Sequence, residues 1–88
     1  MRLRCTVMVK NRLGLHIRPA SHIAKMLQNY KSSVHFSYRE QTVNARSIMS
    51  ILALAVTKNS QVEIIVDGED AHDTLEHLRE AFELQLGD

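Results

Sequence analysis

The stretch from Gly14 to Ala20, GLHIRPA, places an imidazole and a guanidinium two residues apart where a helix is predicted to begin. Helix starts usually recruit Ser, Thr, Asp or Asn, whose side-chain oxygens accept hydrogen bonds from the free backbone N–H groups. His16 offers different chemistry, because a neutral imidazole near pH 7 is a nucleophile and its bond to phosphorus is reactive enough to pass the group onward. The pattern is therefore compatible with a transient phosphohistidine at His16.

The residues around His16 could bind the phosphoryl group. Pro19 suits the first turn of a helix, because an N–H there has no partner within the helix. The N–H groups of Ile17 and Arg18 and the helix dipole form an anion site, and the Arg18 guanidinium can bind phosphate oxygens. Gly14 would let the loop backbone come close to this site. From the residues alone, His16 could equally be a surface histidine with Arg18 solvated.

The remaining residues favour no competing chemistry. No metal site is expected, because Cys5 is the single cysteine and the other histidines lack the HExxH spacing of a zinc site. We expect each of them to be a solvated surface residue: His22, His35, His72 and His77. There is no Walker A loop and no dinucleotide fingerprint, so no cofactor is expected either. A phosphoryl group would have to arrive already activated on another protein or a small donor.

Composition limits the classes of partner and the compartment. The 88 residues include 11 basic and 10 acidic side chains, a balance that gives no field for nucleic acid or an anionic membrane. With two tyrosines, two phenylalanines and no tryptophan, the composition does not favour a base-stacking platform for nucleic acid. The lone Cys5 favours a reducing compartment, and no segment reads as a signal peptide or membrane span. We expect one cytoplasmic domain over residues 1–88.

Hydrophobic periodicity predicts seven elements in the order β-α-β-β-α-β-α. Alternation predicts strands over residues 3–9, 33–38, 41–44 and 61–67. Helical spacing predicts a helix that follows His16 and ends near 29–30, a second over 47–56, and a third that Asp70 can cap. Amphipathic helices need one apolar sheet face to cover, so we expect an α+β layer with three helices on one side of a four-stranded antiparallel sheet.

Some positions within these elements carry specific expectations. Cys5 lies among the inward residues of the first strand, a hairpin turn is expected over 38–40, and Asn59 suits a left-handed turn. Ser47 is a good N-cap for the second helix. The core stripe of that helix is predicted to include Ile48, Ile51, Leu52 and Ala55, which leaves Met49, Ala53 and Val56 partly outward. An exposed Met49 would suit a surface that accepts several partners.

Two separated motifs, GLHIRPA and NARSIMSILAL, resemble the HPr family, the histidine-containing phosphocarriers of the phosphoenolpyruvate-dependent phosphotransferase system. The resemblance covers essentially the whole chain and implies an open-faced β-sandwich of four antiparallel strands and three helices. It implies that His16 is phosphorylated on Nδ1 by phospho-enzyme I and passes the group to enzyme IIA components. Arg18 matches the arginine that steadies the phosphoryl group. The protein would then be a monomeric phosphoryl carrier rather than a stand-alone enzyme.

By the same resemblance, Ser47 matches the serine that HPr kinase/phosphorylase modifies in many bacteria, although the residues alone favour a plain helix cap. Ile48, Met49 and Leu52 fall in the partner-docking region. The sequence departs from the family's usual pattern at five positions: Leu13, Ile17, Ser50, Ala55 and Asn59. The alternative readings are a regulatory HPr-like effector, a carrier of a nitrogen-related phosphotransferase chain, and a binding module in which His16 is incidental.

Overall fold

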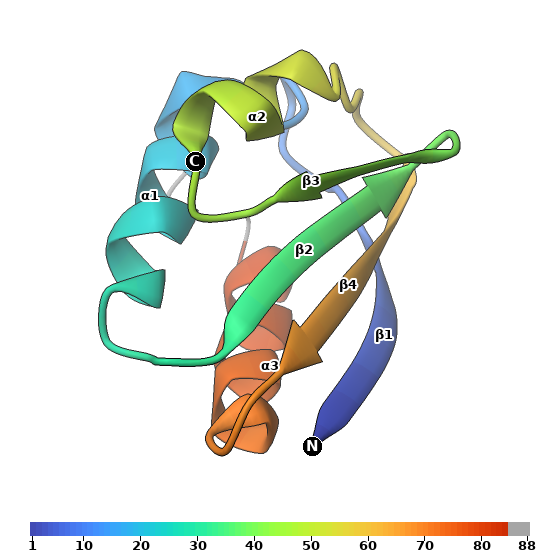
Figure 1. Ribbon diagram of the computed structural model, residues 1–88. Helices are drawn as coiled ribbons and strands as arrows, with labels where there is room; N and C mark the ends of the chain where they lie inside the picture. The colour runs from blue at the N-terminus through green and yellow to red at the C-terminus, as the bar shows by residue number, and fades with distance from the viewer. Residues whose placement is uncertain (85–88) are drawn as a thin grey trace.

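The computed structural model describes residues 1–84 and contains the seven predicted elements in the predicted order (Figure 1). They are β1 (Arg2–Met8), α1 (Ile17–Leu27), β2 (Ser33–Tyr38), β3 (Gln41–Asn44), α2 (Ile48–Ala53), β4 (Gln61–Asp67) and α3 (Ala71–Glu83). Within residues 1–84, no helix has the length and apolar character needed to cross a membrane.

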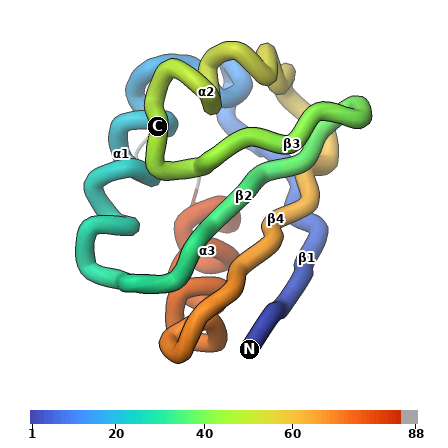
Figure 2. Tube along the Cα trace, in the orientation of Figure 1, coloured from blue at the N-terminus to red at the C-terminus, as the bar shows by residue number. Residues whose placement is uncertain are grey.

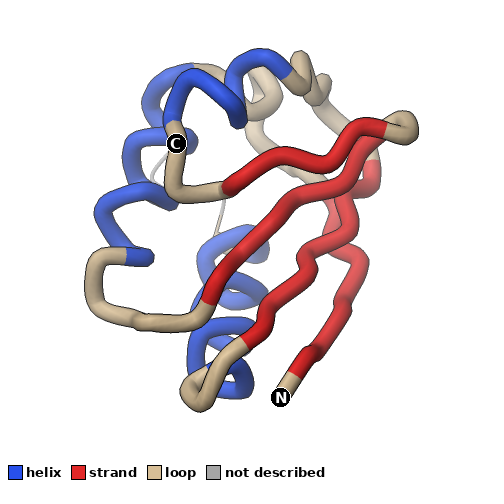
Figure 3. Tube along the Cα trace, in the orientation of Figure 1, coloured by secondary structure: helices blue, strands red, loops and turns tan. Residues whose placement is uncertain are grey.

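The four strands form one antiparallel sheet in the order β1-β4-β2-β3 (Figure 3). Register places apolar residues of neighbouring strands opposite each other, with Ile64 of β4 paired to both Cys5 and Phe36. Because side chains alternate between the two faces of a strand, these residues share one face of the sheet. Cys5 is half-buried and packs against the core, as its place in the alternation predicted.

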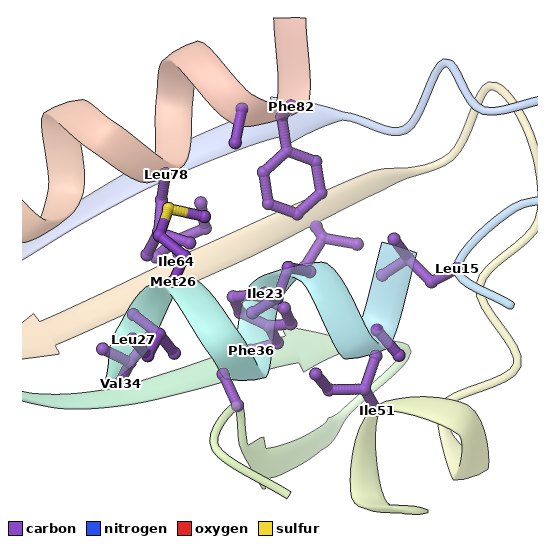
Figure 4. Close-up of a cluster of buried hydrophobic side chains, with 14 of the residues drawn as sticks. Leu15, Ile23, Met26, Leu27, Val34, Phe36, Ile51, Ile64, Leu78 and Phe82 are labelled. Atoms are coloured by element: carbon purple, nitrogen blue, oxygen red, sulfur yellow. The ribbon is translucent and has the colours of Figure 1, made fainter. Parts of the chain in front are cut away.

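The helices cover that apolar face, and the core lies between the two layers. In Figures 1 and 2, α1 and α3 lie behind the sheet, and α2 packs beside α1 at the β3 end. The rings of Phe36 and Phe82 meet edge to face at 5.8 Å, which joins β2 to α3 through the core. Figure 4 shows Ile23, Ile64 and Leu78 converging on the same cluster. The predicted α+β layer is thereby confirmed.

The second helix is shorter than predicted. It ends at Ala53 with Leu54 as its C-cap, and Ala55 is exposed with a left-handed φ of 53°. The expected inward position of Ala55 and outward position of Val56 are both wrong, since Val56 is 3% exposed. The reason is that residues beyond Ala53 no longer follow the 3.6-residue period, so the buried set changes. The first helix likewise ends at Leu27, two residues earlier than expected.

The predicted turns are confirmed. Arg39 and Glu40 both have positive φ, 49° and 65°, which is the backbone of a two-residue turn whose twist suits an antiparallel hairpin. Asn59 has a φ of 69°. Asparagine tolerates this left-handed conformation better than most residues, so its placement before β4 follows from local chemistry.

Asp70 occupies the N-cap position of α3, but its carboxylate does not make the predicted cap bond. It accepts hydrogen bonds from the backbone N–H groups of Lys31 (2.9 Å) and Ser32 (3.0 Å), and also from the Ser32 hydroxyl. The Ser32 hydroxyl and then the Lys31 N–H hold the pKa of Asp70 down to about 2. Asp70 thus ties the α1–β2 loop to the start of α3.

Candidate functional site

His16 is the N-cap residue of α1. Its backbone is extended, with φ −81° and ψ −170°, and its carbonyl oxygen accepts from the Ala20 N–H at 3.1 Å, so helical structure begins at Ile17 as predicted. The His16 side chain makes no cap hydrogen bond with α1 within the described part of the chain. The N–H groups of Ile17 and Arg18 precede the first intrahelical hydrogen bond. This end of α1 can therefore donate hydrogen bonds to a bound anion.

The loop that leads into His16 is held by the chain that follows α2. The Leu15 N–H donates to the Val56 carbonyl oxygen at 3.0 Å, and the Leu15 side chain is buried. Gly14 has a φ of 70°, and a Cβ atom at this position would lie 2.1 Å from the same carbonyl oxygen. Glycine is therefore required for close approach to Val56, a contact that the sequence pattern missed because it placed Val56 outward.

Exposed apolar side chains surround the start of α1. Ile17 and Leu13 are each 64% exposed, and Met49 of the neighbouring helix α2 is 75% exposed, as predicted. Ile48 and Leu52 are instead half-buried and pack against the core, so they offer less surface to a partner than Met49 does. Figures 1 and 2 show α2 lying beside the start of α1.

His16 and Arg18 differ in exposure. Arg18 is exposed, whereas His16 is half-buried and its Nε2 atom is buried. Attack by Nε2 on an external phosphoryl group would require the ring to turn. Arg18 is exposed on the first turn of α1, so its guanidinium can reach an incoming phosphate.

Ser47 caps the second helix, as predicted. Its Oγ accepts a hydrogen bond from the Ser50 N–H at 3.2 Å, and its backbone is extended, which is typical of an N-cap residue. The side chain is half-buried. A phosphate on this oxygen would lie at the start of α2, two residues from the exposed Met49.

Arg46, which precedes Ser47, makes contacts that the sequence analysis missed. Its guanidinium donates to the carbonyl oxygens of Leu27 (2.8 Å), Tyr30 (2.8 Å) and Ser32 (2.7 Å). These acceptors belong to the end of α1 and the loop after it. The acceptors are backbone atoms, which any residue type supplies, so no sequence signal could have identified them.

The other histidines lie outside the GLHIRPA motif. Three of them are exposed, namely His22, His72 and His77, and His35 is half-buried. The described residues contain no group of three or more His, Cys, Asp or Glu side chains that could hold a metal ion. His77 hydrogen-bonds through Nδ1 to the Tyr30 hydroxyl at 2.8 Å.

Comparisons with known proteins agree on one family. The family model for the "PTS HPr component phosphorylation site" matches residues 3–83. The chain is 36% identical over 86 residues to phosphocarrier protein HPr of Chlamydia pneumoniae, covering 98% of this chain and 80% of that protein. The crystal structure of HPr-C-His from Thermoanaerobacter tengcongensis superposes with a TM-score of 0.92 at 29% identity, covering 98% and 97% of the two chains. The crystal structure of HPr from Bacillus anthracis superposes with a TM-score of 0.85 at 32% identity, covering 90% of this chain and 94% of that chain.

Proposed function

Because this chain belongs to the HPr family of phosphotransferase-system phosphocarriers, we propose that His16 accepts a phosphoryl group from phospho-enzyme I and passes it to enzyme IIA components. The observation that carries this proposal is the position of His16 as the N-cap of α1. A phosphoryl group on its ring would lie beside the N–H groups and the positive end of the helix dipole, which favour a dianion.

The transfer exchanges one bond to phosphorus for another. The lone pair of His16 Nδ1 attacks phosphorus, an N–P bond forms, and the bond from phosphorus to the donor breaks with its electron pair leaving on the donor. Burial of Nε2 supports Nδ1 as the attacking atom. The second transfer, to the acceptor, repeats the exchange with the His16 ring as the leaving group. The chain thus acts as a carrier with a transient phosphohistidine and needs no cofactor of its own.

Arg18 is proposed to steady the phosphoryl group. Its exposed guanidinium on the first turn of α1 can bind two phosphate oxygens at once and needs no rearrangement of the fold to do so. Ile17 is proposed to contribute its backbone N–H. The bulky β-branched side chain of Ile17 does not remove that hydrogen-bonding group. Its 64% exposed side chain can instead contact the partner.

Donor and acceptor proteins are proposed to dock over the start of α1 and over α2. Met49 supplies the largest exposed apolar contact on α2, and Ile48 and Leu52 contribute the parts that the core leaves uncovered. A carrier that meets several partners in turn needs a reusable, transient interface, and methionine adapts to different partner shapes.

Ser47 is proposed to be a regulatory phosphorylation site for an HPr kinase/phosphorylase. A phosphate at a helix N-terminus is tolerated electrostatically, so modification would leave the domain folded. It would also put a dianion beside Met49, on the surface that must lose water when a partner docks. Phosphorylation of Ser47 would therefore weaken phosphoryl transfer to His16.

The test is phosphoryl uptake from enzyme I and phosphoenolpyruvate, followed by intact mass. The parent protein should gain one phosphoryl group that is labile in acid and stable in alkali, because a phosphoramidate hydrolyses when its nitrogen is protonated. His16→Ala should gain none, whereas His72→Ala, which removes an exposed histidine of α3, should label like the parent. Full labelling of His16→Ala would move the acceptor to another residue and refute the proposal.

A further inference from the structure

A hollow lies between α1 and α3. It has a volume of about 310 Å³ and is lined by His22, Lys25, Met26, Asn29 and His77. Met26 is 6% exposed and reaches from α1 toward Leu78 of α3, so it forms the apolar floor (Figure 4). The other four side chains are exposed at the rim. The hollow therefore combines a packed base with polar groups that can turn toward a ligand.

One of these polar groups is held in a fixed orientation. The Tyr30 hydroxyl lies 2.8 Å from Nδ1 of His77, and the two rings meet edge to face at 5.7 Å and 74°. Tyr30 itself packs against the core. When the hydroxyl donates to Nδ1, the ring proton is on Nε2, and His77 offers a hydrogen-bond donor on its other edge. Because the His77 ring is already oriented, a ligand that binds it would cost less loss of side-chain freedom.

The charges around the hollow favour an anion. All five lining residues are basic or neutral, and Lys25 is an ammonium at neutral pH. None of the residues that line the hollow is acidic, and two carboxylates of α3 near His77 face other basic side chains, Asp73 facing His72 at 3.6 Å and Glu76 facing Arg79 at 3.0 Å. The C-terminal end of α1 carries the negative end of the helix dipole. The positive charge of the Arg46 guanidinium, which donates to the Leu27 and Tyr30 carbonyl oxygens, offsets it. A metal ion would be repelled by Lys25, although two histidines are present.

We propose that this hollow binds the phosphate group of a small phosphomonoester, with donors from Lys25, Asn29 and His77. His22 provides a further imidazole at the rim. Several donors around one group match the three terminal oxygens of a phosphomonoester better than the two of a carboxylate. The volume reaches the lower end of small-molecule pockets, roughly 300–1,000 Å³, so it leaves room for the rest of the ligand over Met26. Neither His16 nor Arg18 lines the hollow, so the proposed site does not use the side chains proposed for phosphoryl transfer.

The test uses His16→Ala protein, which removes the acceptor imidazole at the start of α1, and follows its imidazole and amide NMR signals during titration with glycerol 3-phosphate. The signals of His22, Asn29 and His77 should shift and saturate together. Lys25→Met should weaken binding by about tenfold, the size expected for loss of one charged hydrogen bond. Tyr30→Phe should also weaken it, because His77 loses its orienting partner. An unchanged amide spectrum away from the hollow would verify that each variant is folded.

Matched controls separate this site from general charge effects. Lys10→Met removes a lysine that lines a different hollow, and Lys58→Met removes an exposed lysine of the loop before β4, so both should bind like the parent. Inorganic phosphate should bind at the same residues more weakly than glycerol 3-phosphate. Anionic lipid vesicles should not compete if the ligand is a free phosphomonoester.

Several results would overturn the proposal. Shifts that fail to saturate, or that are equal in Lys25→Met and the parent, would show that the hollow does not select phosphate. Equal affinity for acetate would make it a carboxylate site, and competition by anionic vesicles would make the ligand a lipid headgroup. Saturable Zn²⁺ binding at His22 and His77 without phosphate binding would make it a metal site.

Discussion

The two ends of α1 differ in their hydrogen bonds. At the start, the His16 side chain makes no cap hydrogen bond with the helix in residues 1–84. At the end, the Arg46 guanidinium donates to three carbonyl oxygens of the helix end and the loop after it. The loop beyond that end is further tied to Asp70 through the Lys31 and Ser32 N–H groups. The two ends of one helix are thus completed in different ways, the first left able to bind an anion and the second fastened by side chains.

This difference assigns stability and chemistry to separate parts of the molecule. Hydrogen bonds tie the end of α1 and the loop after it to Arg46 and to Asp70 at the start of α3, so substitutions there should change the free energy of unfolding. Donors at the start of α1 remain available to a phosphoryl group, so substitutions there should change the rate of transfer with little effect on folding. Four predictions test this separation, from the largest expected effect to the smallest.

The largest effect is expected for Arg46→Met. It removes all three hydrogen bonds from a charged donor and leaves half-buried carbonyls without a protein partner, which should lower the free energy of unfolding by about 3 kcal/mol. Urea unfolding measures this loss. Arg46→Lys should recover part of it, because one ammonium lacks the fork geometry to reach all three carbonyls. Arg2→Met, at an exposed strand residue, should stay within about 0.5 kcal/mol of the parent.

Arg18→Ala should slow phosphoryl transfer and leave the free energy of unfolding nearly unchanged. Loss of the guanidinium leaves backbone N–H groups to hold the phosphate, so transfer from His16 should slow by about tenfold, equivalent to about 1.4 kcal/mol of barrier. The free energy of unfolding should stay within about 0.5 kcal/mol of the parent, because Arg18 is exposed. Rapid-quench transfer to an enzyme IIA measures the rate. An unchanged rate would reduce Arg18 to a solvated side chain and break the proposed separation at this end.

Ser47 tests the start of α2, where cap and proposed switch coincide. Ser47→Ala removes the acceptor for the Ser50 N–H and should cost about 1 kcal/mol of stability, with phosphoryl uptake retained. Ser47→Asp keeps a cap oxygen, so thermal unfolding should be near normal while uptake from enzyme I falls markedly. If Ser47→Asp accepted phosphate as fast as the parent, Ser47 would be a cap and no switch.

The smallest effect is a pH dependence at the end of α1. The pKa of Asp70 lies near 2 in the folded protein, below its ordinary value of 3.8, so its hydrogen bonds stabilise the fold fully above about pH 4. That contribution should be lost as pH falls from about 4 toward 2. The stability of Asp70→Asn should therefore change less than that of the parent across this range, measured by thermal unfolding. Parallel profiles would show that Asp70 contributes no pH dependence.

The fold could be predicted because its elements repeat a simple pattern. Alternation in β1 and β4 and helical spacing in α1 and α3 set the element order and the buried face correctly. The prediction was wrong in the short helix α2, where six helical residues leave the period too brief to fix which of Ala55 and Val56 is buried. Local chemistry was informative at Asn59, whose residue type suits the left-handed backbone.

The candidate site could be predicted only in part. The position of His16 at the helix start and the Ser47 cap follow from short local motifs. The hydrogen bonds that hold these residues in place join distant segments, Leu15 with Val56 and Arg46 with Leu27. Their acceptors are backbone carbonyls, which leave no trace in residue type. The roles proposed for Arg18 and Ser47 in transfer and for Met49 in docking stay predictions.

The strand order has a consequence for when this chain can fold. Among the strands of residues 1–84, β1 pairs with β4 alone, and Arg4 lies 59 residues before its ion-pair partner Glu63. During synthesis, the hairpin of β2 and β3 can form from neighbouring residues, but β1 must wait until residues 61–67 have left the ribosome. Closing this long loop is slow compared with hairpin formation. The segment that leads to His16 therefore emerges early and is fixed in place late, when Val56 and β4 arrive to hold it.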